Sequence, residues 1–163
     1  MLRPMRRGLL TLGTLALILS CGGSSEPAKS ASADGEKLSK GKQCLKDAAA
    51  PRELGPNAPT RIEVSQILVR HDGLKRPEGA TRSPEEACLR ALKALEELQS
   101  GADWEEVVKK YSDAPGATAG GLGYISQTDV DPKFADAAFS LEVNELSYVV
   151  ETDRGFHIIL RTD

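Results

Sequence analysis

Apolar and polar residues alternate between residues 62 and 70, where Ile62, Val64 and Leu68 fall on one side of an extended chain. A period of two is typical of a half-buried β-strand, and we expect this strand to run to Arg70. Three other segments predict further strands: Leu122 to Ser126, Leu146 to Glu151, and Phe156 to Arg161. The last two are joined through Asp153-Arg154-Gly155, so we expect them to form an antiparallel hairpin.

Helical periodicity lies between these predicted strands. One stretch repeats apolar residues at i, i+3, i+4 and i+7, which indicates a helix packed on a core: Cys88, Ala91, Leu92, Leu95 and Leu98. Ser83-Pro84-Glu85-Glu86 begins this helix as a capping box with proline at the first helical position, and we expect it to end near Gly101. Asp103 opens a second helix ending near Tyr111, and Asp131-Pro132 caps a third. Helices inserted between strands predict an α+β domain.

Two polar residues interrupt the apolar faces of the predicted strands. Gln66 lies on the same face as Val64 and Leu68, and His157 lies on the same face as Ile159. A polar side chain on a buried face needs a hydrogen-bond partner. In one arrangement the first and last strands are neighbours and Gln66 lies close to His157. In the other, which the pattern alone favours, each finds a separate partner in the core.

The N-terminal segment has the features of a secretory signal. Three arginines precede an apolar run from Leu9 to Leu19, which spans only about 16 Å as a helix and is too short to cross a bilayer core of about 30 Å. Ser20-Cys21 follows and resembles the lipoprotein box of bacteria, so residues 1–20 are predicted to be removed and Cys21 to be lipidated. Gly22 is not the aspartate that retains some lipoproteins at the inner membrane, which favours the outer membrane. An ordinary cleaved signal is the alternative.

Residues 21–60 differ in composition from the rest of the mature chain. They are rich in Gly, Ser, Ala, Lys and Pro and poor in large apolar residues. Such a segment buries too little surface to offset the entropy of ordering, so we interpret it as a lipidated flexible tether with a transient helix over Lys37 to Ala50. A partner-binding segment is the alternative. One domain remains, from Arg61 to Asp163.

Charge and cysteine content restrict the partners and the compartment. Without residues 1–20 the chain keeps 18 of its 21 basic residues and all 24 acidic ones, a formal charge of −6 that argues against a nucleic-acid partner. Outside the cytoplasm Cys44 and Cys88 can form a disulfide. Because Cys88 lies on the apolar helix face, a buried free cysteine is the interpretation that we favour.

Three motifs near the C-terminus carry a family resemblance: Gly120-Gly121-Leu122-Gly123-Tyr124, Phe134-Ala135-Asp136-Ala137-Ala138-Phe139, and Gly155-Phe156-His157-Ile158-Ile159-Leu160. In this order they resemble the parvulin family of peptidyl-prolyl cis/trans isomerases, and the resemblance extends upstream to about Arg61. It implies a four-stranded antiparallel sheet flanked by helices, and an enzyme acting on the X-Pro peptide bond. It implies no metal and no cofactor.

The resemblance also implies the site residues. Parvulins carry a histidine at each of the positions of Gln66 and His157, linked to a cysteine or aspartate where this chain has Ala114, while Thr152 matches the residue that supports the second histidine. Gln66 and Ala114 therefore depart from the family pattern, and Asp113 is one position away from the cysteine/aspartate place. The proline pocket is matched by three apolar residues: Leu122, Val130 and Phe134.

A basic loop follows the first predicted strand. Arg70, Lys75 and Arg76 match the cations with which phosphate-directed parvulins hold the residue before proline. In an acidic protein they favour an anionic substrate side chain, and outside the cytoplasm we expect Asp or Glu rather than phosphate. A solvated surface patch is the alternative, and His71 is expected to be structural.

These features together predict an extracytoplasmic, membrane-anchored isomerase that assists the folding of exported polypeptides. Its partners are expected to be unfolded or folding chains that contain X-Pro bonds. Gln66 and Ala114 favour an alternative of another class, a non-catalytic holdase that binds proline-containing peptides in the same pocket.

Overall fold

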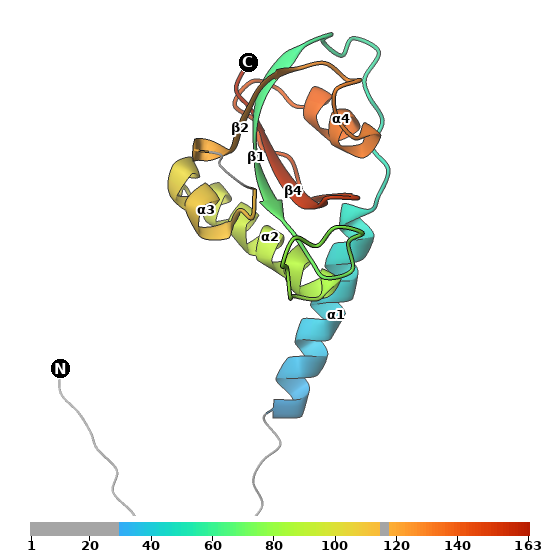
Figure 1. Ribbon diagram of the computed structural model, residues 1–163, viewed down its shortest axis with the longest axis vertical. Helices are drawn as coiled ribbons and strands as arrows, with labels where there is room; N and C mark the ends of the chain where they lie inside the picture. Colours follow the sequence, from blue (N-terminus) through green and yellow to red (C-terminus); the bar gives the residue numbers. More distant parts are fainter. Residues whose placement is uncertain (1–29, 115–117) are drawn as a thin grey trace, which may run out of the picture.

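The computed structural model describes residues 30–114 and 118–163, which form a four-stranded antiparallel sheet with helices on both faces (Figure 1). The strands lie in the order β2-β1-β4-β3. In chain order the elements are α1 (Ser30–Ala48), β1 (Ile62–Val69), α2 (Pro84–Gln99), α3 (Trp104–Tyr111), a 3-10 turn (Thr118–Gly120), β2 (Gly121–Ile125), α4 (Pro132–Phe139), β3 (Val150–Thr152) and β4 (Gly155–Arg161). The predicted α+β architecture is confirmed.

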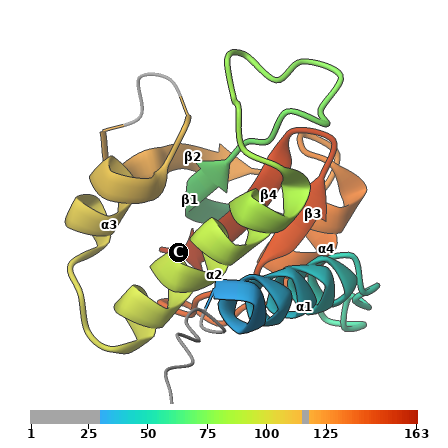
Figure 2. The ribbon, with the colours of Figure 1, turned by 90° about the horizontal axis from the view of Figure 1, so that it is seen from below.

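Each face of the sheet carries its own hydrophobic core. On one face α2 and α3 pack on β1 and β4, with α1 alongside α2; we call this the helix-side core (Figure 2). On the other face α4 packs on β3 and β4; we call this the α4-side core. The side chains of β1 point alternately into the two cores. Ile67 and Val69 belong to the helix-side core, and Ile62 and Val64 belong to the α4-side core.

The predicted helix caps are present. The Ser83 hydroxyl accepts from the Glu86 backbone N–H, and the Glu86 carboxylate accepts from the Ser83 backbone N–H, at 3.2 and 3.1 Å. Asp103 and Asp131 cap α3 and α4 in the same way, by accepting backbone N–H groups of the first turn. These local interactions set where the three helices begin.

The strand predicted over Leu146 to Glu151 is shorter than expected. Only Val150–Thr152 pairs as β3, and Leu146 makes one isolated bridge to Leu160. Between them the Ser147 hydroxyl accepts from the Ile159 backbone N–H at 2.9 Å and donates to the Tyr148 carbonyl at 2.7 Å. This side chain bonds to main-chain groups, and so the regular ladder is interrupted.

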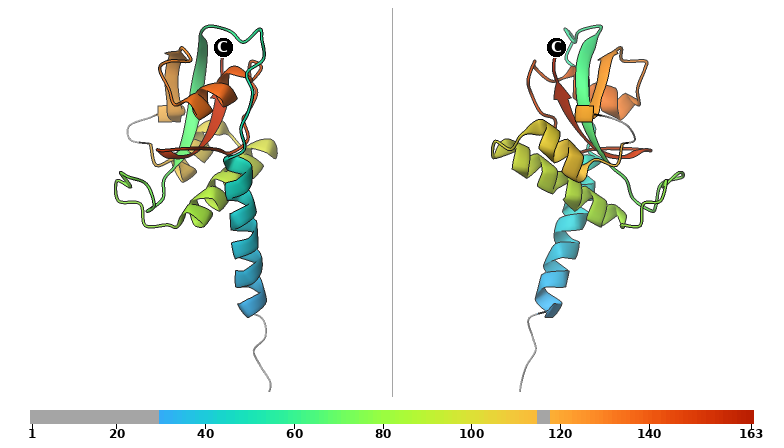
Figure 3. Two further views of the ribbon diagram at one scale, coloured as in Figure 1. Left: turned by 90° about the vertical axis from the view of Figure 1, so that its right-hand side faces the viewer. Right: turned by 60° about the vertical axis from the view of Figure 1, so that its left-hand side comes forward.

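The helix expected over Lys37 to Ala50 is present and begins earlier, because α1 covers residues 30–48; the prediction that this part of the tether is flexible and only transiently helical is wrong. This helix crosses α2 so closely that a side-chain Cβ at Gly41 would lie 2.7 Å from Cβ of Glu85. Cys44 and Cys88 form a disulfide between the two helices, and both are buried in the helix-side core. The favoured interpretation of Cys88 as a free thiol is therefore wrong as well. The N-terminal part of α1 projects beyond the rest of the fold (Figure 3).

The signal segment and the lipidation site Cys21 lie outside the described residues. Among the residues that are described, no helix has the length and apolar character needed to cross a membrane.

Candidate active site

A cavity of about 310 Å³ lies on the α4 face of the sheet, and we call it the cup. The three residues predicted to form a proline pocket all line it, and so do both polar residues that interrupt the strand pattern. Its full lining is Gln66, Leu122, Ile125, Asp129, Val130, Asp131, Phe134, Thr152, Arg154 and His157. The fold thus brings the middle of β1, strand β2 with the β2–α4 connection, the first turn of α4 and the β3–β4 hairpin to one place.

His157 and Gln66 are neighbours, as the strand pattern and the family resemblance together predicted. β1 pairs directly with β4, with Leu68 opposite His157 and Gln66 opposite Ile159, so the two polar side chains share one face two positions apart. The distance from His157 Nδ1 to Gln66 Oε1 is 2.8 Å. On the other side of the ring, His157 Nε2 lies 2.7 Å from Thr152 Oγ1.

For a neutral imidazole these contacts allow one direction for the hydrogen bonds. The Gln66 Oε1 atom only accepts, so the His157 Nδ1–H donates to it and the unprotonated Nε2 accepts from the Thr152 hydroxyl. The Thr152 oxygen in turn accepts from the Arg154 backbone N–H at 3.1 Å. Every link in this chain uses a neutral imidazole.

The electrostatics of the cup agree with that assignment. Burial of the ring, with a smaller contribution from the positive charge of Arg154, lowers the pKa of His157 to about 3. His157 is therefore uncharged throughout the physiological pH range. It orients its neighbours by hydrogen bonding and does not act as a cation.

Phe134 belongs to both the cup and the α4-side core. It lies in the first turn of α4, is buried, and meets the His157 ring edge-on with centroids 5.3 Å apart. Leu122, by contrast, is 41% exposed at the mouth of the cup. An apolar wall with an exposed rim is suited to hold a small apolar ring such as that of proline.

Gly120 makes the approach of the preceding loop to Gln66 possible. Its φ is +70°, and a Cβ at this position would lie 2.1 Å from the Gln66 carbonyl oxygen, so only glycine fits. The Trp104 indole N–H donates to the Ala119 carbonyl at 2.7 Å and holds the same turn. The turn Thr118–Gly120 thus packs directly behind Gln66.

Among the described residues no further side-chain hydrogen bond extends the network beyond Gln66, and Ala114, at the place where the resemblance expects a cysteine or aspartate, has no polar side chain. The nearby Asp113 does not replace the missing group. Its carboxylate accepts from the Arg70 backbone N–H at 2.8 Å and pairs with the Arg82 guanidinium, so it is turned towards the loop after β1.

The predicted basic loop is only partly available to a ligand. The Arg70 guanidinium pairs with Glu78, and its side chain is 14% exposed. It lines a separate small hollow with Arg82 and Asp113 and not the cup. Lys75 and Arg76 are exposed. His71 is buried against Phe156, and burial lowers the pKa of its imidazole, which agrees with a structural role.

Sequence reasoning missed four residues that line the cup. Ile125 adds apolar wall, and Asp129 accepts from the backbone N–H and hydroxyl of Ser126, both at 2.7 Å. Asp131 was predicted only as a helix cap. Arg154 was assigned only to a turn, although its position two residues after Thr152 is a signal that could have placed it at the site.

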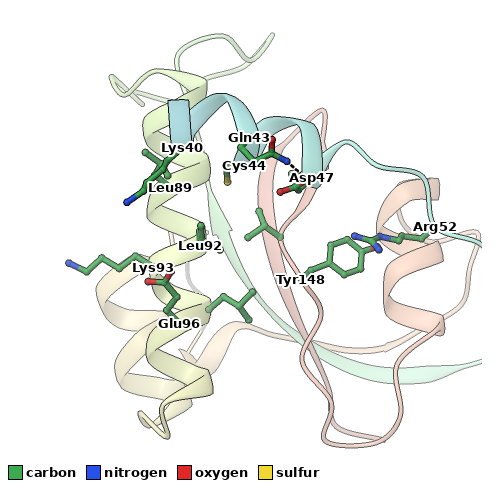
Figure 4. Close-up of a pocket in the computed structure, with 13 residues that line it drawn as sticks. Lys40, Gln43, Cys44, Asp47, Arg52, Leu89, Leu92, Lys93, Glu96 and Tyr148 are labelled. Atoms are coloured by element: carbon green, nitrogen blue, oxygen red, sulfur yellow. Dashed lines mark hydrogen bonds between the residues drawn. The ribbon is translucent and has the colours of Figure 1, made fainter. Parts of the chain in front are cut away.

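A larger hollow of about 720 Å³ lies between α1, α2 and residues 148–149 (Figure 4). It shares no lining residue with the cup. Its walls include Leu89, Leu92 and Tyr148, and the Arg52 guanidinium stacks 3.5 Å from the centre of the Tyr148 ring. It contains no histidine, so its size does not make it the better candidate. Within the described residues no cluster of three His, Cys, Asp or Glu side chains could hold a metal ion.

Comparison with known proteins agrees with the geometry. The family model described as the PPIC-type PPIase domain matches residues 52–163, which begins before the predicted domain boundary at Arg61. Peptidyl-prolyl cis-trans isomerase pin1 of Schizosaccharomyces pombe is 40% identical over 124 residues, covering 72% of this chain and 70% of that protein. Among solved structures, peptidyl-prolyl isomerase ESS1 from Candida albicans superimposes with a TM-score of 0.60 at 26% identity, covering 82% of this chain and 77% of that one.

Two relatives named for folding assistance match over shorter spans. Chaperone SurA of Methylobacillus flagellatus is 43% identical over 104 residues, 60% of this chain and 22% of that protein. Foldase protein PrsA of Halalkalibacterium halodurans is 43% identical over 75 residues, 45% of this chain and 22% of that protein. Because the family model matches residues 52–163, which contain the whole sheet, α4 and the cup, the chain belongs to the parvulin, or PPIC-type, family of peptidyl-prolyl cis/trans isomerases.

Proposed function

We propose that this protein catalyses cis/trans isomerisation of X-Pro bonds in exported polypeptides and so assists their folding outside the cytoplasm. The observation that carries the proposal is the cup, in which Phe134 faces a neutral His157 held between Gln66 and Thr152. Leu122, Val130 and Phe134 bind the proline ring. His157 and Gln66 form the polar wall against which the prolyl amide rotates, and Thr152 orients the imidazole.

The chemistry needs neither a nucleophile nor a metal. Rotation must overcome amide resonance, a barrier of about 18–20 kcal/mol, and uncatalysed X-Pro exchange takes tens to hundreds of seconds. Binding against the apolar wall of the cup takes the carbonyl of the residue before proline out of water, which disfavours the charge-separated planar form of the X-Pro amide relative to the twisted one. Gln66 uses its carbonyl oxygen on His157, so its amide N–H groups are the polar donors that we assign to the twisted substrate.

Three observations support an extracytoplasmic setting. The first residues have the pattern of a secretory signal followed by Cys21. The fold contains a buried disulfide between Cys44 and Cys88, a bond that persists in oxidising compartments. Two relatives are named for foldase or chaperone activity. We further propose that Cys21 carries a lipid and that the outer membrane holds the anchor.

The lipid anchor has a direct test. Cys21→Ser is expected to abolish labelling of the protein by radioactive palmitate and to move it from the membrane fraction to the soluble fraction. Cys44→Ser is the matched control, because it removes a cysteine of the mature chain and leaves labelling intact. Labelling that persists in Cys21→Ser would remove the anchor from the proposal.

A non-catalytic holdase is the second candidate, and the truncated network favours it. Ala114 ends the hydrogen-bond chain, and glutamine stands at the first histidine position. Such a protein would bind proline-containing peptides in the cup and release them without accelerating exchange.

A protease-coupled isomerisation assay on the oxidised chain from residue 22 onward separates the two. We expect acceleration above background that is weaker than for a parvulin with both histidines. A chain that binds Ala-Pro peptides in the cup but leaves their exchange at the uncatalysed rate would be a holdase. The α1 helix must be included, because it is bonded to the domain through Cys44 and Cys88.

A further inference from the structure

Arg154 is the one lysine or arginine that lines the cup within the described part of the chain. It lies in the β3–β4 turn, and its side chain is exposed. Its backbone N–H is engaged with Thr152 Oγ1, which fixes the base of the residue directly beside the His157 ring. Its guanidinium forms no ion pair with any of the residues 33–114 and 119–163. The only hydrogen bond that Arg154 makes to the described residues is that of its backbone N–H, so the five N–H donors of the guanidinium can bind a ligand in the cup.

The loop that sequence reasoning assigned to an anionic substrate is less suitable. Arg70 is already neutralised by Glu78, and Arg82, the other arginine of that hollow, is paired with Asp113 and with the Arg70 carbonyl. Lys75 and Arg76 are exposed, but neither lines the cup. A charge beyond the walls of the cup is screened by salt, whereas one on its rim meets the substrate directly.

Two carboxylates also line the cup, and both are held by local hydrogen bonds. Asp129 accepts from Ser126, and this bonding keeps the pKa of its carboxyl below the usual value. Asp131 caps α4 through the Lys133 backbone N–H at 2.9 Å. Both belong to the β2–α4 connection, while Arg154 belongs to the hairpin that supplies His157. The cup therefore has a cationic side and an anionic side.

We propose that Arg154 binds an anionic group, a carboxylate or a phosphoryl group, on the residue next to the prolyl bond, and so determines which substrates the cup prefers. The planar guanidinium can take either group through two parallel hydrogen bonds. This inference rests on the proposed isomerase function and names the specificity-determining residue of that same site. It assigns to Arg154 the role that the basic loop was expected to have.

The test compares substrate preference in matched charge-removing variants. Isomerisation kcat/KM and peptide Kd are measured for the wild type, Arg154→Gln, Arg70→Gln and the pair Lys75→Gln with Arg76→Gln. The peptides carry Ala-Pro, Glu-Pro, phosphoserine-Pro or Pro-Glu in one common sequence. Comparing Glu-Pro with Pro-Glu shows whether the anion precedes or follows proline, and comparing Glu with phosphoserine separates the two anionic groups.

We expect the wild type to favour one anionic peptide over Ala-Pro by about fivefold, the range of an exposed ion pair. Arg154→Gln should reduce this ratio to below about twofold, Arg154→Lys should restore part of it, and the loop variants should keep it. At 1 M salt, where the Debye length is about 3 Å, the preference should shrink.

Two results would overturn the inference: equal values for anionic and neutral peptides in the wild type, or a preference that is lost in the loop variants and kept in Arg154→Gln. If no peptide is isomerised faster than background, the proposed enzymatic function fails by itself. The ratio of Kd values then decides the role of Arg154, because binding does not require turnover.

Discussion

The two faces of the sheet differ in what they bury. The helix-side core contains apolar residues and a disulfide, and α1, α2 and α3 cover it. The α4-side core is covered by one short helix, and next to it His157 and Thr152 are buried with their polar groups bonded to each other. A single strand supplies both, because Ile67 faces the helices while its neighbour Gln66 faces the cup. We infer that the helix side contributes mainly stability and that the α4 side gives up some apolar contact to carry a polar site.

The disulfide offers the largest test of this division. Cys44 and Cys88 close a loop of 44 residues, for which chain-entropy arguments give about 4 kcal/mol of stabilisation. Replacing both by serine should lower the free energy of unfolding in urea by about 2–4 kcal/mol. Because the bond lies in the helix-side core, kcat/KM for an X-Pro peptide should stay within about twofold of wild type while the variant remains folded. If the variant keeps its stability but loses activity, the helix side of the sheet supports the catalytic site and does not mainly stabilise the fold.

Acid should act on the α4 side through His157. Its pKa of about 3 in the folded protein lies below the value of about 6.5 expected in the unfolded chain. Between these two pH values the unfolded state binds a proton on this imidazole and the folded state does not. The resulting stability is present above pH 6.5 and is lost as pH falls towards 3. Between pH 7 and pH 5 the loss from this one group is about 2 kcal/mol.

Urea titrations at several pH values measure this loss. His71 is a second buried imidazole whose pKa is lowered, so it contributes in the same direction. The control is therefore His157→Gln, which should flatten the part of the pH dependence that belongs to the cup and leave the part due to His71. An unchanged slope would mean that folding does not lower the pKa of His157, so that the imidazole takes up its proton over the same pH range in the folded and unfolded states.

Local signals account for most of what the sequence predicted correctly. The caps at Ser83 and Asp131 involve neighbours within three residues, and the alternation around Gln66 and His157 reports which face of a strand is buried. Together with the family resemblance, that alternation placed two residues together that are 91 positions apart.

The errors have non-local causes. α1 is poor in large apolar residues, and it is held by its contact with α2 and by a disulfide that composition does not reveal. β3 is shortened because Ser147 bonds across to Ile159, which depends on the fold already being formed. Arg154 lies in a turn, where no periodicity marks the direction of a side chain. The catalytic roles of the cup residues remain predictions.

Within the cup, substitutions in the apolar wall and in the hydrogen-bonded chain around His157 should affect activity to different extents. Phe134→Ala opens the surface that excludes water from proline, so we expect kcat/KM to fall by at least about tenfold, or 1.4 kcal/mol. His157→Ala should reduce activity less and instead lower stability by about 1–3 kcal/mol, because Gln66 and Thr152 lose their shared partner. Measuring both quantities on both variants checks the assignment. A greater loss of activity in His157→Ala would make the imidazole the principal catalytic group.

The smallest expected effect is a gain of activity. It tests whether Gln66 and Ala114, which depart from the family pattern, limit catalysis by the polar side of the cup. Gln66→His together with Ala114→Asp restores the residue types of the family network around His157. If the present enzyme is limited by that truncation, turnover should rise by about three- to tenfold, or roughly 1 kcal/mol of transition-state stabilisation. Each single change should do less than the pair, because residues in one hydrogen-bond network couple.

Stability is the control for this gain, since the new aspartate must find a partner or leave a charge half-buried beside Asp113. A parallel change on the helix side, Leu92→Ile in the wall of the larger hollow, should leave turnover unchanged. If the double variant stays folded and turnover does not rise, Gln66 and Ala114 do not limit catalysis, and the cup already works through its apolar wall alone. That outcome would make Phe134, and not His157, the principal catalytic side chain. The hydrogen-bonded chain of Gln66, His157 and Thr152 would then serve only to keep the cup in shape.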